Sequence, residues 1–345
     1  MELLLISVKS DISHGGIAVW TDRFLSRCAA QGISCSLVNT ELIGSRVETG
    51  RRNPFDELVR TLRIFRQLKG QLKSGSFRAA HLNTSCGNFG LFRDLLIARY
   101  IKARGIPLVT HYHCDIPYWI RNGISRRCLG LLARLSDRNL VLCENSRRFM
   151  KDNYSLDCVK LSNFVEADTV LDKPRDIRPR VERVFFVGRV EQAKGVEELY
   201  AVARQLPHIT FQLVGNVCSQ VKGWEKPDNV RLLGTLPNDQ VITRLDEADL
   251  FILPSHTEGC SMALMEAMAR GVPAIATDVG ANADMLSEDC GIITPKHDIA
   301  AMVAAIRAME DPVLRQTMSR NAVEKVRREY TDRNVDEILA IIENI

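Results

Sequence analysis

The chain has 345 residues, of which 46% are hydrophobic and 26% are charged, as is usual for a globular protein with a sizeable core. No apolar stretch is long enough to span a membrane, and Glu2 stands where a signal peptide needs a basic region, so we expect neither feature. Residues 1–165 hold 25 basic and 13 acidic residues, a charge of +12, whereas the remainder carries −8. This asymmetry predicts two halves that meet different partners.

Ten cysteines are scattered along the chain without a C-x-x-C pair. We therefore expect reduced thiols in a cytoplasmic protein, with neither a disulfide framework nor a bound metal.

In the first half, short apolar runs alternate with helical patterns, which is typical of a doubly wound α/β domain. Strands are predicted near 3–8, 33–38, 79–83, 106–110, 139–142 and 158–161. Helices are predicted near 16–30, 55–73, 89–104, 124–137 and 145–152. We expect an N-terminal Rossmann-like domain over residues 1–165.

The second half repeats this alternation after a polar segment with two prolines, which predicts a linker at 166–180. Strands are predicted near 183–187, 210–214, 230–233, 249–253, 273–276 and 291–293, and closing helices near 297–309, 312–329 and 332–343. We expect a C-terminal Rossmann-like domain over 181–330. The helix within 331–345 is expected to pack back towards the N-terminal domain.

The first motif of the second half is a strand that runs into a glycine turn, R-V-F-F-V-G-R at 183–189, followed by Lys194. Gly188 permits a close backbone approach. Arg189 and Lys194 bracket a short loop, and both can reach a diphosphate, whose charge two such cations neutralise without a metal. Taken alone, the same residues also fit a surface Arg and Lys near a helix start.

The second motif is P-S-H-T-E-G-C-S-M-A-L-M-E-A-M-A-R-G-V-P at 254–273. It places Glu258 before a helix and Glu266 inside it. The preceding apolar strand directs the helix N-terminus to the carboxyl edge of a parallel sheet, where such proteins bind ligands. Free N–H groups there favour an anion, and the two carboxylates favour ligand hydroxyls. A site for phosphate beside a site for several hydroxyl groups predicts that the ligand is a nucleotide sugar.

The two motifs resemble those of the retaining GT-B glycosyltransferases of family 4 (glycosyl transferases group 1). The resemblance rests on G-R-x4-K-G and on P-S-x2-E-G-x6-E-A-M-A-x-G-x-P, which is followed by A-T-D-V-G. Their order and spacing match over 183–295, and the first half is similar more weakly. The resemblance implies an α/β fold of GT-B type, with two Rossmann-like doubly wound domains that face each other across a cleft.

The resemblance also implies roles for single residues. Arg189 and Lys194 would hold the donor diphosphate, Glu258 would contact hydroxyls of the transferred sugar, and Glu266 the nucleotide ribose. Other donor contacts would come from Gly188, Gly215, Gly259, Cys260 and Ser261. Two positions depart from the family pattern: Ala281 stands in place of a second glycine and Asp284 in place of a Glu.

In the first half, S-H-G-G-I at 13–17 places Gly15 and Gly16 at the start of a helix. In the family such a loop admits the donor phosphate and the acceptor. The pair is not G-x-G-x-x-G, so a dinucleotide site is weakly supported, and a plain tight turn also explains it.

The strand near 106–110 is followed by His111, His113 and Asp115 at the carboxyl edge of the sheet. Strand alternation puts His111 and His113 on one face. The family has one histidine here that contacts the sugar; His113 matches it better and His111 is the runner-up. It also remains open that the histidine only makes hydrogen bonds to nearby backbone and has no role in binding. Asn163 matches a cleft position near the hinge.

The predicted helix over 55–73 carries an apolar stripe with basic flanks, made up of Leu58, Leu62, Phe65, Leu68 and Leu72. Trp119 and Arg121 lie in an aromatic and basic segment after the His strand. Both features fit contact with an anionic lipid surface or a lipid diphosphate acceptor. They also fit a core-facing helix with a solvated basic side, and a partly buried loop.

The resemblance implies a retaining, metal-independent enzyme, with a nucleotide sugar as substrate and no further cofactor. In front-face attack, the departing phosphate oxygen takes the acceptor proton while Arg189, Lys194 and the helix N-terminus stabilise the leaving charge. Asp115 is a candidate for the alternative, a covalent nucleophile. We expect a UDP-sugar donor, and a glycan or lipid-linked acceptor from surface polysaccharide assembly. The location is expected to be cytoplasmic, with a peripheral position on the inner face of the membrane left open.

Two other functions stay open. A GT-B-like nucleotide-sugar epimerase would use the same phosphate contacts with His111, His113 and Asp115 as acid and base groups. A non-catalytic module would bind nucleotide sugars or glycans without turnover. Nucleic acid is not expected as a partner, because the positive charge is spread through α/β elements without a recognised motif.

Overall fold

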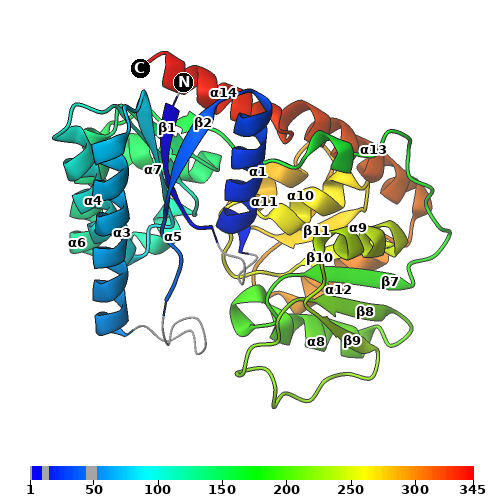
Figure 1. Cartoon of the computed structure of the whole chain (residues 1–345). Coiled ribbons are helices and arrows are strands. Elements are labelled where there is room, and N and C mark those ends of the chain that lie inside the picture. The colour runs from blue at the N-terminus through cyan, green and yellow to red at the C-terminus, as the bar shows by residue number, and fades with distance from the viewer. Residues whose placement is uncertain (1, 10–14, 44–52) are drawn as a thin grey trace. The chain divides into compact units, whose positions relative to one another are not determined.

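The structure is a computed structural model that describes residues 2–9, 15–43 and 53–345. The chain forms two compact units (Figure 1). Unit 1 consists of Met1–Ser162 together with Asp332–Ile345, and unit 2 is Asn163–Thr331. Residues 166–180, the predicted linker, lie in unit 2 and include a 3₁₀ turn at Ala167–Thr169. Within the described ranges, no helix is both long and apolar enough to cross a membrane.

Unit 1 is built on a parallel six-stranded sheet in the order β2-β1-β3-β4-β5-β6. The strands are β1 (Glu2–Ser7), β2 (Ser34–Asn39), β3 (Ala79–Thr84), β4 (Leu108–Tyr112), β5 (Arg138–Val141) and β6 (Val159–Lys160). The helices are α1 (Gly16–Ala30), α3 (Pro54–Ser74), α4 (Asn88–Lys102), α5 (Ile116–Trp119), α6 (Gly123–Leu135), α7 (Glu144–Tyr154) and α14 (Arg333–Glu343).

The two faces of this sheet have different partners, because successive residues of a strand point to opposite sides. One face packs on α3, α4 and α6 in an apolar core that includes Leu4, Leu82 and Leu108. On the other face, α1 places Trp20 and Phe24 against His81 of β3. This second face therefore carries buried polar side chains where a core normally holds aliphatic ones.

Helix α3 buries only part of its apolar stripe. Leu68 is buried, but Leu58 is 54% and Leu62 is 63% exposed. A helix of 21 residues extends about 31 Å, whereas a strand of six residues such as β2 extends about 20 Å. The N-terminal turns of α3 therefore have less sheet beneath them, and the buried side there is formed by the Glu57–Arg60 ion pair.

The C-terminal helix α14 packs within unit 1. Its residues Val335, Ile338, Leu339 and Ile342 are buried. The guanidinium of Arg27 in α1 makes ion pairs with Asp332 at 3.1 Å and with Asp336 at 2.9 Å. The hydrogen bond from Arg27 keeps the pKa of Asp336 below its ordinary value.

Unit 2 repeats the architecture with a parallel sheet in the order β12-β11-β10-β7-β8-β9. The strands are β7 (Arg183–Val187), β8 (Thr210–Val214), β9 (Val230–Gly234), β10 (Leu250–Leu253), β11 (Ala274–Thr277) and β12 (Gly291–Thr294). The helices are α8 (Val196–Gln205), α9 (Asn238–Glu247), α10 (Met262–Ala269), α11 (Asn282–Leu286), α12 (Ile299–Ala308) and α13 (Pro312–Glu329). Helices α8 and α12 lie on one face of this sheet, and α9 and α10 on the other (Figure 1).

The predicted strands, and the helices for which we gave bounds, occur within two residues of their expected ends. The sequence predicts neither α5 nor α11, which have about one turn each and too few residues for a periodic pattern.

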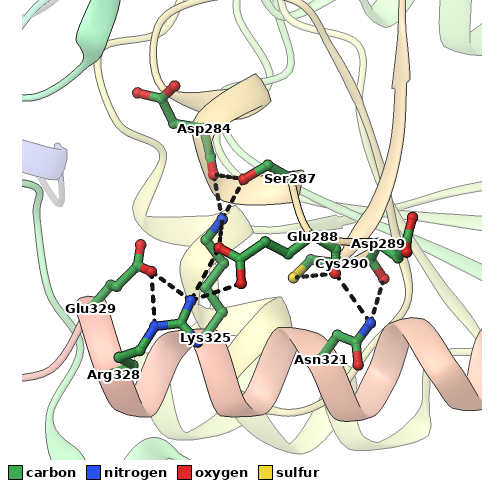
Figure 2. Close-up of polar contacts among 9 residues, drawn as sticks. All are labelled: Asp284, Ser287, Glu288, Asp289, Cys290, Asn321, Lys325, Arg328 and Glu329. Carbon is green, nitrogen blue, oxygen red and sulfur yellow. Dashed lines mark hydrogen bonds and ion pairs between the residues drawn. The ribbon is translucent and has the colours of Figure 1, made fainter.

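Helix α13 is held against the turn between α11 and β12 by a buried lysine (Figure 2). Lys325 is 2% exposed, and its Nζ donates to the Asp284 carbonyl at 2.7 Å and to Ser287 Oγ at 2.5 Å. Glu288 lies 3.3 Å from the same nitrogen and also pairs with Arg328, which is half-exposed. Asp284, one of the departures from the family pattern, therefore supports this corner through its backbone carbonyl.

We predict that Lys325→Ala destabilises the protein by about 2–4 kcal/mol, because it leaves a buried carbonyl without its donor and opens a cavity. Arg328→Ala is the matched control: its charge is exposed, so it should leave the stability nearly unchanged. Urea unfolding followed by circular dichroism measures both. Equal effects of the two substitutions would contradict the role given to Lys325.

Candidate functional site

Two loops of unit 2 meet where the order of its strands reverses. Strand β7 lies between β10 and β8, so the chain moves outwards on one side to β9 and then returns to the other side at β10. Such a switch point opens a crevice at the carboxyl ends of parallel strands, where α/β proteins bind ligands. The loops after β7 and β10 carry both sequence motifs.

A lysine–carboxylate contact joins the two loops. Lys194 Nζ lies 2.7 Å from Glu258 Oε1, and Ser255 Oγ donates to the same oxygen at 2.6 Å. The Lys194 side chain is 21% exposed and that of Glu258 is 10% exposed. The backbone N–H of His256 also donates to the Ala193 carbonyl at 3.0 Å. The lysine is therefore held in place, with an exposed side on which an anion can compete with Glu258.

Arg189 has a different carboxylate partner from Lys194. Its side chain is 66% exposed and its guanidinium pairs with Glu191 at 2.8 Å. The two cations expected at the diphosphate thus have separate carboxylate partners, and Arg189 keeps the greater freedom to move.

Two glycines are required by close backbone contacts around the loops. At Gly215, at the end of β8, a Cβ would lie 1.9 Å from the carbonyl oxygen of Gly188 at the end of β7. At Gly280, which has φ +57°, a Cβ would lie 2.4 Å from the Glu258 carbonyl and 2.5 Å from that of Gly259. Any side chain at either position would displace the loop that bears Glu258 or the end of β7.

The loop that follows β11 supports the same backbone. The N–H of Ala281, which stands in place of the family's second glycine, donates to the Gly259 carbonyl at 2.9 Å. Ala281 is itself buried, at 1% exposure.

Helix α10 begins at the second motif and presents its N-terminus at the switch point. Ser261 is its N-cap, and its Oγ accepts from the N–H of Leu264 at 3.3 Å. Cys260 is buried with its Sγ 3.8 Å from Met285 Sδ, and Glu266 is buried within the helix. The partial positive charge of the helix end favours an anion beside Lys194.

Asn163 belongs to unit 2, two residues before the end of the predicted N-terminal domain. Its Nδ2 donates to the Cys260 carbonyl at 2.8 Å. The structure thus brings Asn163 to the second motif, 97 residues further along the chain.

In unit 1, the two candidate histidines share one face, as strand alternation predicts. The His111 and His113 ring centroids are 4.1 Å apart, and Trp20 of α1 lies 4.9 Å from the His113 ring. His111 is fully buried, whereas His113 is 9% exposed. His81 of β3 stacks on His111 at 5.7 Å, and neither of its ring nitrogens has a hydrogen-bond partner among the described residues. Neither Trp20 nor His81 stands in a recognisable motif, so the sequence gives no signal for them beyond the place of Trp20 on the apolar side of α1.

The remaining candidates of unit 1 lie at the two ends of α5. Asp115 is its N-cap residue and accepts from Asn145 Nδ2 at 3.1 Å. Trp119 is 40% exposed, and Arg121 stacks over the Tyr118 ring at 4.6 Å.

Of the predicted glycine loop, Gly15 caps α1 and Gly16 begins it. The expected positions Ser13 and His14 lie outside the described residues.

Comparison with known proteins matches part of the chain to a protein family. Residues 169–325 match the family model described as glycosyl transferases group 1. The matched segment lies within unit 2. The matched range contains both loops at the switch point, and a glycogen synthase of Mycobacterium tuberculosis is 24% identical over 251 residues, 65% of this chain and 60% of that protein. The chain spans about three-fifths of the length of the curated relatives it matches first.

Solved structures share the fold over the whole length of the chain. Sucrose-phosphate synthase from Thermosynechococcus elongatus has a TM-score of 0.81 at 17% identity, over 100% of this chain and 98% of that one. The Anabaena protein HepE in complex with UDP has a TM-score of 0.76 at 15% identity, with both chains fully covered. The fold is therefore of GT-B type, as the motifs predict.

The buried histidines predict a pH-dependent stability of unit 1. Burial lowers the pKa of His111 to about 3, and burial together with the neighbouring His111 holds the pKa of His81 well below its ordinary value. Both are neutral when folded but take up protons near pH 6.5 when unfolded. Stability is thus complete above about pH 6.5 and falls as the pH drops towards 3, by about 1.4 kcal/mol per pH unit for each histidine.

Tryptophan fluorescence during urea unfolding measures this in a Trp224→Phe background, where both remaining tryptophans, Trp20 and Trp119, lie in unit 1. His81→Phe should roughly halve the slope between pH 4.5 and 6.5, while His208→Gln, at an exposed position, should leave it unchanged. A slope unaffected by His81→Phe would show that His81 is not kept neutral by the fold.

Proposed function

We propose that this protein is a retaining glycosyltransferase that moves a sugar from a UDP-sugar to an acceptor hydroxyl without a metal ion. The observation that carries the proposal is the contact of Lys194, Glu258 and Ser255 at the switch point of unit 2. These three residues lie within the segment that matches the glycosyl transferases group 1 model, which supports glycosyl transfer. The UDP bound to the structurally similar HepE supports the choice of base.

Lys194 and Arg189 take the donor diphosphate in this proposal, and the N-terminus of α10 adds partial positive charge. Binding of the diphosphate replaces part of the contact between Lys194 and Glu258, which frees the carboxylate of Glu258 to accept hydrogen bonds from sugar hydroxyls. Glu266 accepts from the ribose. Gly188 and Gly215 leave room for the nucleotide, because neither has a side chain and their backbones are in contact with each other.

The reaction step needs no nucleophile from the protein. The bond between the anomeric carbon and the diphosphate oxygen breaks, and the acceptor oxygen bonds to the same face of that carbon. The acceptor proton passes to the departing phosphate oxygen. Lys194, Arg189 and the α10 N-terminus stabilise the negative charge that develops on the leaving diphosphate.

Unit 1 supplies the acceptor side in this proposal. His113 contacts the transferred sugar, because it is partly accessible whereas His111 is fully buried and supports its ring. Asp115, Trp119 and Arg121 are the proposed acceptor contacts, and the acceptor is a glycan or a lipid-linked glycan. Burial disfavours His111 as an acid or base of an epimerase, which leaves His113 and Asp115 for that role. Incubation with UDP-sugars alone separates the two functions, since only an epimerase turns over without an acceptor.

We predict that Lys194→Ala lowers kcat of sugar transfer by about 10²–10³-fold, because it removes a cation that acts on charge formed in the transition state. Arg189→Ala should lower it in the same direction. Release of UDP from UDP-sugar in the presence of acceptor measures both.

Lys222→Ala removes an exposed lysine of the same unit and should keep normal turnover. Thermal shift with UDP, GDP, ADP and CMP tests the base separately: the wild type should be stabilised most by UDP, and Lys194→Ala less than the wild type. Near-normal turnover of both Lys194→Ala and Arg189→Ala would refute the assignment.

We further propose that unit 1 docks on an anionic membrane surface at the cytoplasmic face. The apolar patch of α3 consists of Phe55, Leu58, Val59 and Leu62, which are 69%, 54%, 40% and 63% exposed. Arg66, Lys69 and Lys73 continue the same helix with exposed cations. Apolar side chains beside basic ones favour the boundary between lipid headgroups and acyl chains. The charge of +12 over residues 1–165 favours anionic lipids.

We predict that the wild type floats with vesicles that contain about 30% phosphatidylglycerol and not with neutral phosphatidylcholine vesicles. Leu58→Ser combined with Leu62→Ser should remove most of the bound fraction, because each buried methylene contributes about 0.8 kcal/mol. Val313→Ser is the matched control, since Val313 is 71% exposed in unit 2. Equal flotation of the double variant and the wild type would contradict docking through α3.

A further inference from the structure

Three side chains with metal-binding atoms meet beside the loop that carries Glu258. Glu198 comes from α8, His256 from the loop between β10 and α10, and His297 from the turn before α12. Glu198 Oε1 lies 2.9 Å from His256 Nε2 and 2.5 Å from His297 Nδ1. One ligand atom from each residue lies within 4.8 Å of the other two. Three distant chain segments thus direct donor atoms to one point.

We propose that Glu198, His256 and His297 bind a divalent transition-metal ion, with Zn²⁺ as the best match. Two imidazole nitrogens and one carboxylate form a ligand set that zinc favours, with a fourth position open to water. A tetrahedral zinc ion about 2.0–2.2 Å from each ligand holds the ligand atoms about 3.4 Å apart. Small rotations of the three side chains produce this spacing from the distances in the structure.

The carboxylate has an unused oxygen. Glu198 is only 8% exposed, and its Oε2 is buried without a hydrogen-bond partner among the described residues. A buried carboxylate oxygen with no donor is stabilised by a bound cation.

The site is also open to solvent. The His297 side chain is 59% exposed and that of His256 is 20% exposed, so an ion can enter past His297. The two ring centroids are 4.1 Å apart, and one nitrogen of each ring is in contact with Glu198.

An ion here would act on the donor loops. His256 precedes Glu258 by two residues, and its backbone N–H holds the Ala193 carbonyl next to Lys194. The ion would therefore fasten α8, the loop after β10 and the turn after β12 to one another. This role concerns ion binding and loop stability, and it holds whether or not the protein transfers a sugar.

Without a metal, the same three residues form a hydrogen-bonded cluster in which two imidazoles stabilise a buried carboxylate. The two interpretations differ in one measurable respect. A hydrogen-bonded cluster contributes the same stability at every zinc concentration, whereas a metal site adds stability only when the ion is present.

The test uses the full chain, freed of metal with a chelator and kept reduced, and titrated with ZnCl₂ by calorimetry. The wild type should bind one Zn²⁺ with a Kd in the micromolar range or tighter, and zinc should raise its Tm. His297→Asn and Glu198→Gln should weaken binding by at least about tenfold. His297 has φ +62°, a conformation that Asn tolerates, so His297→Asn should fold normally.

His208→Asn is the matched control, because His208 is an exposed histidine of the same unit, and it should bind zinc like the wild type.

Cobalt substitution distinguishes this site from the ten cysteines: a spectrum without a thiolate charge-transfer band supports N/O ligands. Absence of saturable zinc binding, wild-type affinity in His297→Asn, or a thiolate band as the sole signal would each overturn the proposal. Loss of stability in Glu198→Gln with no zinc dependence in the wild type would establish the hydrogen-bonded cluster instead.

Discussion

The loops after β7 and β10 must converge, because the strands that precede them are parallel neighbours at the point where the strand order of unit 2 reverses. The contact of Lys194 with Glu258 spans this junction, and Ser255 accompanies it on the same carboxylate oxygen. The Lys194 ammonium and the Glu258 carboxylate lie 2.7 Å apart. Each can form a hydrogen bond with a charged ligand in place of part of this contact. Gly280 and Ala281 fix the backbone beneath Glu258, so the geometry depends on the loop after β11 as well.

Unit 1 has the same architecture but a different kind of interior behind its candidate residues. His81, His111 and His113 lie among Trp20 and Phe24, and the histidine rings pack edge to face against these aromatic rings. His113 is the member nearest solvent, so the buried rings beneath it determine its orientation. The same unit exposes apolar residues on α3, because that helix is longer than the strands it covers.

Secondary structure was predictable because hydrophobic periodicity is a local property of the chain. Apolar runs of about five residues marked each strand, and the two glycine-bearing motifs marked the ends of β7 and β10. The sequence left open whether the α3 stripe faces the core or a lipid surface, since periodicity shows which residues share a face but not how far the sheet extends beneath that face. The structure leaves Leu58 and Leu62 exposed. The positions of Arg189, Lys194 and Glu258 at one edge followed from the parallel topology, whereas their partners did not.

The amino-acid sequence by itself determined the doubly wound fold of both halves, the family motifs and the loops that carry them. Only the tertiary structure decided which charged and polar groups meet. Glu198 and His297 are 99 residues apart, and Asn163 and Cys260 are 97 apart, yet each pair is in contact. Spacing along the chain carries no information about such pairs, because they depend on how helices and loops pack around the sheet. The physical reason is that side-chain contacts are short-ranged in space, whereas the patterns in a single sequence are short-ranged along the chain.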